Sequence, residues 1–353
     1  MAIQWVNSFE DLNNTSGSGS TFVLDRLIGW SNVGTGDTTN FYQNSDNTAN
    51  KNTQFPMPGN KGLSAFLATT GTNFANFTTI QRSVVDNNKL VLCGGFRTQF
   101  PAYLKSTAIM SFGGANKLSF GLNGKFAALY VNDTLAATSA VDIVTGSPWS
   151  FITLFQDKGA NKLYLRINGQ IAADVDLPAG HTTNAAILDL GRDVGGYQSN
   201  FSEVMVYDSV DPMGPLLVGE YFKTTNVVNQ FTGSTNIVNN RPFSDASFVN
   251  SETSGAEDRF SYTNILPVGM ELGSIKAVIQ KAVAASGGVT GGSLNLRMRI
   301  GASTTNYDTS VSSALVSTTP VLVQKVWETN PATSAAWTRS EVQSVQTGYV
   351  VAA

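Results

Sequence analysis

Hydrophobic and polar residues alternate with a period of two along most of the chain, whereas long stripes with a helical period of 3.6 are nearly absent. Short turns rich in Asn, Gly and Asp separate the alternating segments, because these residues reach positive φ at little steric cost. Asn168 and Gly169 predict a two-residue hairpin. The pattern predicts a sandwich or barrel, with strands at 21–28, 89–94, 107–112, 117–122, 126–131, 150–156, 162–167, 170–176, 187–190 and 201–207.

The alternation is interrupted at residues 211–221, where two prolines and two glycines occur, and we place a domain boundary between 212 and 213. Further strands are predicted at 258–262, 273–285, 293–300 and 319–328. The segment 274–286 fits one face of a helix or one face of a strand. Its β-branched residues and the Gly-rich stretch that follows favour a strand.

One helix is predicted at residues 339–347. Thr338 and Glu341 have the spacing of a capping box, and Gly348 suits the position just after the helix. Val342 and Val345 give the helix one apolar face, and Trp337 is expected to pin it to the sandwich.

The sequence has 353 residues, of which 42% are hydrophobic, so the chain can bury sizeable cores. Only 13% are charged, against roughly 25% in an ordinary soluble domain. The surface is therefore expected to consist largely of Asn, Thr, Ser, Gln and Gly. Such neutral polar surfaces are common on extracellular β-proteins and on viral particles.

The net charge of −3 and the lack of a Lys/Arg cluster argue against nucleic acid as a partner, because neutralising phosphates requires a basic surface. Arg297 and Arg299 alternate along a predicted strand, which places both on one face. No stretch approaches the ~18 apolar residues of a membrane span, and the N-terminal segment lacks the basic and apolar regions of a secretory signal. We expect neither nucleic-acid binding nor membrane insertion.

One histidine and one cysteine leave little material for catalysis or metal binding. His181 is expected to be exposed in a turn, and no second histidine exists to share a metal with it. Cys93 is expected to be a buried, inert thiol. The nucleophile motif G-x-S-x-G is absent.

Glycoside hydrolysis would need two carboxylates about 5–9.5 Å apart. Asp174 and Asp176 share one face of a predicted strand, and Glu252 lies close in sequence to Glu257 and Asp258. We interpret both groups as solvent-facing structural carboxylates. The sequence therefore predicts a protein that is not an enzyme and has no catalytic residues.

Three segments of the first domain follow one another in a characteristic order: KLSFGLNGKFAALYVND, SPWSFITLFQDKGANKLYLRINGQIAADVD and LDLGRDVGGYQSNFSEVMVYD. Through these segments, residues 1–212 resemble the laminin-G/concanavalin-like jelly-roll superfamily. The resemblance implies two packed antiparallel sheets.

Four segments characterise the second domain: FVNSETSGAEDRFSYTNI, GSIKAVIQKAVAAS, LNLRMRIGASTTNYD and VWETNPATSAAWTRSEVQSVQTGYVV. Through these segments, residues 220–353 resemble a domain of tailed-bacteriophage virion proteins. In such proteins the domain lies on the particle's exterior, in tail fibres, tail-tip proteins or capsid decorations. The resemblance assigns no catalytic residue.

The first resemblance implies a candidate calcium site, because laminin-G-like sandwiches often hold Ca²⁺ at one rim through carboxylates and backbone carbonyls. The candidate ligands are Asp157, Asp189 and Asp193, which lie in or next to turns. No other cofactor is expected.

Aromatic side chains offer a candidate glycan contact. Tyr197 lies in an exposed turn and is the residue we select for that role. We interpret the other candidates as core residues, namely Trp30, Trp149, Trp327 and Trp337.

The sequence thus predicts an all-β chain with a concanavalin-like (laminin-G-like) jelly roll at 1–212 and a smaller antiparallel β-sandwich with one short helix at 213–353. The preferred hypothesis is a non-enzymatic structural protein on the exterior of a bacteriophage virion, as a capsid decoration or a tail or fibre component, made in the bacterial host's cytoplasm. Its partners would be other virion proteins and copies of itself, for which a trimer is common among exterior phage proteins. The alternatives are a carbohydrate-binding adhesin that recognises a host surface glycan and, third, a depolymerising enzyme.

Overall fold

The structure is a computed structural model, and it describes residues 2–7, 21–22, 31–32, 41–43, 65–67, 78–99, 108–146, 149–190, 198–209, 212, 214, 223–233, 248–262, 274–286, 293–309 and 321–352. The chain divides into two compact units, Met1–Gly219 and Glu220–Ala353. The sequence pattern places the boundary a little earlier, between 212 and 213.

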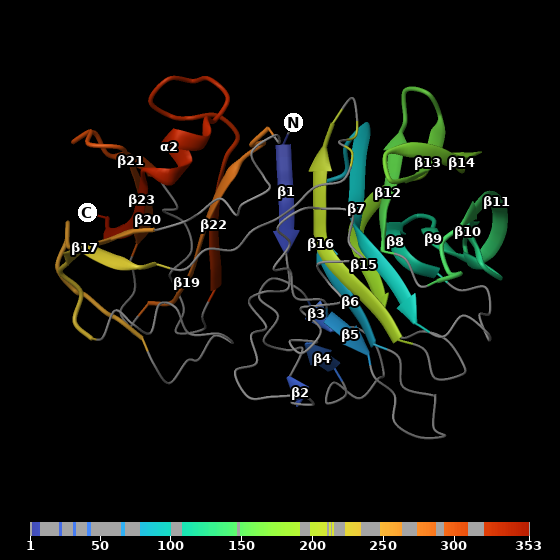
Figure 1. The fold of residues 1–353 in the computed structure, drawn as a ribbon, viewed down its shortest axis with the longest axis horizontal. Helices are drawn as coiled ribbons and strands as arrows, with labels where there is room; N and C mark the ends of the chain where they lie inside the picture. The colour runs from blue at the N-terminus through green and yellow to red at the C-terminus, as the bar shows by residue number, and fades with distance from the viewer. Residues whose placement is uncertain are drawn as a thin grey trace. The chain divides into compact units, whose positions relative to one another are not determined.

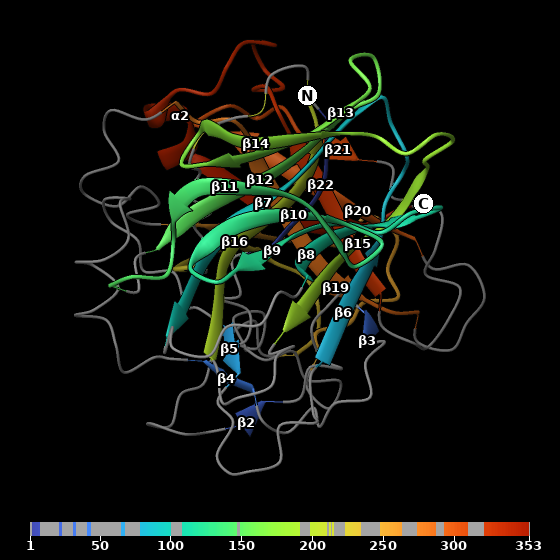
Figure 2. The same ribbon diagram turned by 90° about the vertical axis from the view of Figure 1, so that its right-hand side faces the viewer.

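The first unit contains a nine-stranded sheet, drawn in Figure 1. The strands β14, β13 and β12 lie side by side at one end of it (Figure 2). Strand β1 (Ala2–Asn7) pairs with β16, and the main path runs in the order β14 (Gln170–Asp176), β13 (Lys162–Ile167), β12 (Ser150–Asp157), β7 (Lys89–Gln99), β16 (Gln198–Asp208), β5 (Ala65–Leu67), β4 (Phe41–Gln43), β2 (Thr21–Phe22).

A seven-stranded sheet forms the second layer of this unit. The strand pairings described in both sheets are antiparallel, as expected for strands joined by short turns. The order of its strands is β11 (Thr134–Asp142), β10 (Phe126–Val131), β9 (Leu118–Asn123), β8 (Ala108–Gly114), β15 (Thr183–Leu190), β6 (Thr78–Ser83), β3 (Ser31–Asn32).

One hydrophobic core joins the two layers. Phe96 of the nine-stranded sheet meets Phe120 of the seven-stranded sheet edge to face, with ring centroids 5.5 Å apart. Alternation along β13 explains which side chains enter this core, because every second residue is buried. The core members from β13 are Leu163, Leu165 and Ile167.

The predicted hairpin at Asn168 and Gly169 is confirmed. It joins β13 to β14, and both residues have positive φ, 50° and 86°. The Asn168 side-chain oxygen also accepts a hydrogen bond of 2.8 Å from the backbone N–H of Phe151. The same residue therefore forms the turn and ties it to β12.

A bulge interrupts β16 at Glu203. The register with β7 shifts between Ser202 and Met205, and Glu203 has a φ of 47° and is fully buried. Phe201 and Val204 both belong to the core although they are three positions apart. Strict alternation would place them on opposite faces, so the extra residue restores the core-facing pattern.

The second unit contains a five-stranded sheet and a two-stranded sheet, all antiparallel. The expected strand within 274–286 is confirmed as β19. The five-stranded order is β17 (Thr225–Asn229), β18 (Glu257–Ser261), β23 (Val345–Val351), β20 (Leu294–Ile300), β21 (Tyr307–Thr309), and β19 (Val278–Ala284) pairs with β22 (Val321–Trp327).

The predicted capping box is confirmed, but the helix is shorter than expected. Helix α2 (Arg339–Gln343) begins after Thr338, whose hydroxyl accepts from the Glu341 N–H while the Glu341 carboxylate accepts from the Thr338 N–H. The predicted position of Gly348 after the helix is wrong. The segment from Val345 onward pairs with β20 instead, because the ladder offers its backbone groups better partners than an exposed helical turn.

The second unit's core supports the expected role of Trp337. Its indole N–H donates to the backbone oxygen of Trp327 at 2.7 Å, and both indoles pack with Met298, Val342 and Val345. Trp337, just before helix α2, and Val342, within it, thereby fix the helix to the sheet.

The all-β fold class is confirmed: the first unit is a jelly-roll-type sandwich, and the second is a smaller antiparallel sandwich with one short helix among the described residues. In that same part of the chain, no helix has the length and apolar character needed to cross a membrane.

Candidate functional site

The first candidate site is a group of five side chains on β12, β13 and β14, which we call the outer patch. They point away from the core because they alternate with the core residues of β13. The members of the outer patch are Phe155, Lys162, Tyr164, Arg166 and Asp174.

Aromatic rings form the floor of the outer patch. Tyr164 lies directly opposite Phe155, and the two rings stack with centroids 5.8 Å apart and an interplanar angle of 22°. The guanidinium carbon of Arg166 lies 5.9 Å from the Phe155 centroid. Phe155 is buried and Tyr164 is half-buried, so Tyr164 is the ring that presents an apolar surface to solvent.

Charges at the rim of the outer patch balance. The Lys162 ammonium lies 2.7 Å from a carboxylate oxygen of Asp174 and 2.9 Å from one of Asp176. The hydrogen bonds to Asp174 and then Asp176 raise the pKa of Lys162. Lys162 and Arg166 of the patch are matched by Asp174 of the patch and by Asp176 beside it. The patch together with Asp176 therefore combines a flat apolar ring with polar groups of balanced charge.

Asp174 and Asp176 are exposed, as predicted, with side-chain exposures of 42% and 75%. Both are bound to one lysine. Neither carboxylate is buried in a cleft, as the acid of a glycosidase usually is.

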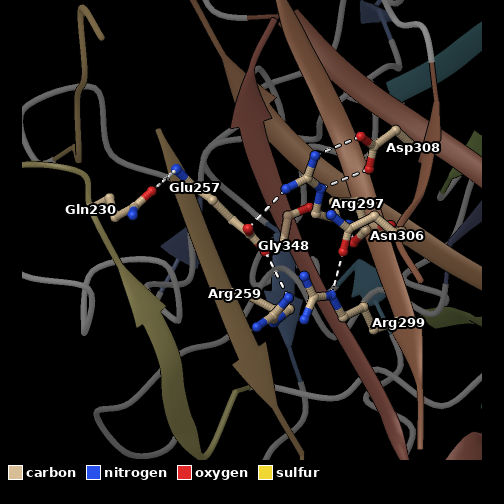
Figure 3. Close-up of polar contacts among 9 residues, drawn as sticks. Gln230, Glu257, Arg259, Arg297, Arg299, Asn306, Asp308 and Gly348 are labelled. Carbon is tan, nitrogen blue, oxygen red and sulfur yellow. Dashed lines mark hydrogen bonds and ion pairs between the residues drawn. The ribbon is translucent and has the colours of Figure 1, made fainter. Parts of the chain in front are cut away.

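The second candidate site is a set of five charged residues on one face of the five-stranded sheet, which we call the charge cluster (Figure 3). Gly348 of β23 lies between Arg259 of β18 and Arg297 of β20 in the register, and Asp308 of β21 lies opposite Arg297. Directly opposed residues share a face. The cluster consists of Glu257, Arg259, Arg297, Arg299 and Asp308.

Arg297 uses all of its nitrogen atoms. Its Nε and Nη2 donate to the two carboxylate oxygens of Asp308, each at 2.7 Å, and its Nη1 donates to Glu257 Oε2 at 2.8 Å. This forked pairing is a strong form of ion pair. The hydrogen bonds to Asp308, ahead of those to Glu257, raise the pKa of Arg297 despite its burial.

Arg259 has fewer hydrogen-bond partners than Arg297. Its Nη1 lies 3.0 Å from Glu257 Oε1, but the alignment is outside hydrogen-bond geometry, and both its Nε and Nη1 are buried without a hydrogen bond. Burial lowers the pKa of Arg259; the Glu257 charge opposes this, and the charges of Arg299 and Arg297 add to it. Arg299 donates from Nε to the side-chain oxygen of Asn306 and has no carboxylate partner among the described residues.

The predicted calcium ligands have different surroundings. Asp157 pairs with the Lys89 ammonium at 2.9 Å, and its other oxygen accepts from the Ala160 N–H. Burial alone would raise the pKa of Asp157, but these partners hold it below its usual value. Asp189 lies on β15, in the opposite sheet from Asp157.

The remaining predicted site residues, Asp193 and Tyr197, lie outside the described residues, as does Trp30. Among the residues that the structure describes, no three His, Cys, Asp or Glu side chains gather as a metal site. The calcium site and the Tyr197 glycan contact stay predictions.

The prediction that His181 is exposed is wrong. Its side chain is buried, and its Nε2 lies 3.1 Å from Gln156 Oε1 and 3.0 Å from Thr183 Oγ1. The turn closed by the His181 N–H and the Pro178 oxygen directs the imidazole inward. Cys93 is buried, as predicted.

The sequence analysis identified neither the outer patch nor the charge cluster as a candidate functional site. It placed Arg297 and Arg299 on one face, which the structure confirms. The interpretation of Glu257 and Asp258 as solvent-facing carboxylates is wrong, because both are buried and Glu257 begins β18. The available signal was a charged residue at every second position of a predicted strand. That pattern occurs at Arg297 and Arg299, and again at Glu257 and Arg259.

No family model matches the sequence, and no curated protein matches it. Among solved structures, the chain is similar to a carbohydrate esterase from the Shiga toxin-encoding bacteriophage phi24B, with 12% identity, a TM-score of 0.35, and coverage of 53% of this chain and 96% of that one. It is similar to the metal-free carbohydrate recognition domain of Emp46p, with 12% identity, a TM-score of 0.36, and coverage of 56% and 94%. A sialidase is similar at 8% identity and a TM-score of 0.30, over 43% of this chain and only 16% of the sialidase. Likenesses of this strength assign neither an activity nor a ligand to the chain.

Proposed function

We propose that this protein is a carbohydrate-binding recognition protein that works by adhesion and without catalysis. The observation that carries the proposal is the outer patch, in which the Tyr164 ring lies on Phe155 between the Lys162–Asp174 pair and Arg166. A half-exposed aromatic ring beside fixed hydrogen-bonding groups fits a ligand with an apolar face and a polar edge.

A sugar ring has this character. Its C–H face would lie on Tyr164, and its hydroxyl groups would accept from Arg166 and Lys162 and donate to Asp174. Because the rim charges cancel, the patch fits a neutral sugar better than an acidic one. The stacked Phe155 holds Tyr164 in place before the ligand arrives, which lowers the entropy lost on binding.

We place this function on the exterior of a tailed-bacteriophage particle, where a host surface glycan is the ligand. Two sequence features support this setting: the resemblance of residues 220–353 to phage virion domains, and a surface with only 13% charged residues in the chain. Other virion proteins are the expected partners that attach it.

The test is a glycan array probed with the purified full chain. Wild type is expected to bind a defined set of neutral glycans, Tyr164→Ala to lose that binding by about tenfold or more, and Tyr164→Phe to keep most of it. Phe248→Ala is the matched control, since Phe248 is an exposed aromatic residue of the other unit. A flat array for wild type, or equal binding by Tyr164→Ala, rejects the proposal.

The absence of catalysis is tested separately. The protein is incubated with each glycan that it binds, and new reducing ends and released acyl groups are measured. Turnover above a buffer control would show that the protein is an enzyme.

A second candidate function is a structural subunit of the virion that contacts other copies of itself. The edge strands β11 and β14 contact each other (Figure 2) and carry exposed apolar side chains, Leu135, Val141 and Ile171, exposed by 44%, 39% and 58%. Exposed apolar side chains on paired edges favour burial against a partner. Sedimentation of wild type and of Ile171→Asp tests this: a trimer or other oligomer that the substitution dissociates is expected, and a monomeric wild type would count against it.

A further inference from the structure

We propose that the charge cluster of the second unit binds an oxyanion, the carboxylate or sulfate group of an acidic sugar, between Arg259 and Arg299. This site is separate from the outer patch, which lies in the first unit, and either site can exist without the other.

Counting the charges shows why the cluster is incomplete. Among the described residues, three arginines share the face with two carboxylates, Glu257 and Asp308. Arg297 takes both oxygens of Asp308 and one oxygen of Glu257. What remains for Arg259 is a single Glu257 oxygen, which is placed near it but accepts no hydrogen bond.

Arg259 is short of hydrogen-bond partners. Its side chain is only 7% exposed, and two of its three guanidinium nitrogen atoms, Nε and Nη1, are buried without hydrogen bonds. An incompletely satisfied buried cation is destabilising unless a partner is supplied. The missing partner must accept hydrogen bonds and carry negative charge.

Arg299 is the second arginine of the proposed site and the one that an anion from solvent can reach. It is only half-buried, and it lies two residues from Arg297 on the same face of β20. Figure 3 shows its guanidinium and that of Arg259 directed toward each other over β23, and their charges influence one another. Two guanidinium groups that face each other repel, whereas an oxyanion between them accepts from both.

Strand β23 separates β18, which carries Arg259, from β20, which carries Arg299. In the register Arg259 lies opposite Gly348, and Arg299 lies opposite Gln346, two positions away along β23. The site is built on three strands rather than on loops, so its donors are held rigidly before binding. A planar carboxylate or a tetrahedral sulfate, rather than a neutral hydroxyl, matches paired guanidinium forks.

The experiment is calorimetric titration of the full chain with sodium sulfate, sodium glucuronate and galactose, at constant ionic strength set with chloride. Wild type is expected to bind glucuronate saturably and galactose not at all at this site. Arg299→Gln is expected to weaken glucuronate binding by roughly tenfold or more, which is the effect of one charge-assisted hydrogen bond. Arg259→Lys, which keeps the charge but loses the fork, is expected to weaken it as well.

Lys125→Gln, at an exposed lysine of the first unit that belongs to neither site, is the matched control and is expected to leave glucuronate binding unchanged. Circular dichroism and thermal unfolding without added anion establish that each variant is folded, and the wild-type titration stands without any variant. No saturable binding of either anion, or equal glucuronate affinity for wild type and Arg299→Gln, overturns the proposal. Binding of sulfate alone retains the oxyanion site but rejects the acidic sugar. Loss of neutral-glycan binding in Tyr164→Ala with glucuronate binding intact separates this site from the proposed function.

Discussion

Gly348 lies so close to β18 that a Cβ atom added to it would stand 2.0 Å from the backbone oxygen of Asp258. The same atom would lie 2.8 Å from the Cα of Arg259. Because the obstacle is backbone rather than the end of a flexible side chain, the two strands would have to separate to admit any other residue. Glycine at this position therefore brings the strands that carry the charge cluster into contact.

Replacing this glycine is expected to destabilise the second unit. Gly348→Ala should reduce the free energy of unfolding by about 3 kcal/mol, because the added methyl group clashes with the neighbouring strand. Denaturant unfolding followed by the fluorescence of Trp327 and Trp337 measures it. Gly214→Ala is the control, since a Cβ there meets nothing within 4 Å. Equal stability of Gly348→Ala and wild type would contradict the close approach.

The capping box gives a second prediction. Thr338→Ala removes the hydroxyl that accepts from the Glu341 N–H, and should cost about 1 kcal/mol of unfolding free energy in the second unit. Thr338→Ser keeps the acceptor and should stay within a few tenths of wild type. The same fluorescence-monitored titration compares the two, and an equally large loss in Thr338→Ser would show that the methyl group matters rather than the cap.

The buried His181 predicts a pH dependence of the first unit. Burial lowers the pKa of His181 in the folded protein, the Lys158 charge lowers it further, and Asp86 opposes both. The unfolded chain therefore takes up the proton first, at a pKa of about 6.5, so stability is full above that pH and falls as the pH decreases toward the folded pKa.

One proton limits the slope of this loss to about 1.4 kcal/mol per pH unit. His181→Gln should flatten the dependence between about pH 7 and the folded pKa. Thermal unfolding of both proteins across this range is the measurement. Parallel curves for wild type and variant would mean that other groups cause the dependence.

Cys93 predicts a chemical readout of unfolding. Its thiol is fully buried, and burial raises its pKa far above the usual value, although a hydrogen bond from the Met205 backbone opposes this. The folded protein should therefore react with a thiol reagent only as fast as the first unit opens. Rapid modification in native buffer, at the rate of a free thiol, would contradict the burial.

Local pattern was enough to predict much of the first unit. Alternation along 162–167 identified β13 and the faces of its residues, and Asn168 with Gly169 identified the turn that follows. These features depend on neighbours in sequence, so one strand and one turn carry their own signal.

The charge cluster was not predictable in the same way. Glu257 and Arg297 are 40 residues apart, and they meet only because β23 inserts between β18 and β20. Strand order is set by long-range pairing, which no local window contains. Pairing with β20 also explains why the residues from Val345 onward form a strand and not the end of the predicted helix. In the same way, the burial of His181 depends on its contacts with Gln156 and Thr183, which local sequence does not reveal.

The bulge at Glu203 also separates two parts of β16, which pair on the same side with two different strands, β5 and β1. Asn200 and Phe201 pair with β5, whereas the residues from Val204 to Asp208 pair with β1. Glu203 thus marks the position at which the pairing partner of β16 changes from the internal strand β5 to β1 at the start of the chain. Deletion of Glu203 would leave Phe201 and Val204 two positions apart, which regular alternation places on one face, so the shortened strand should keep its core-facing side chains and lose only the irregularity.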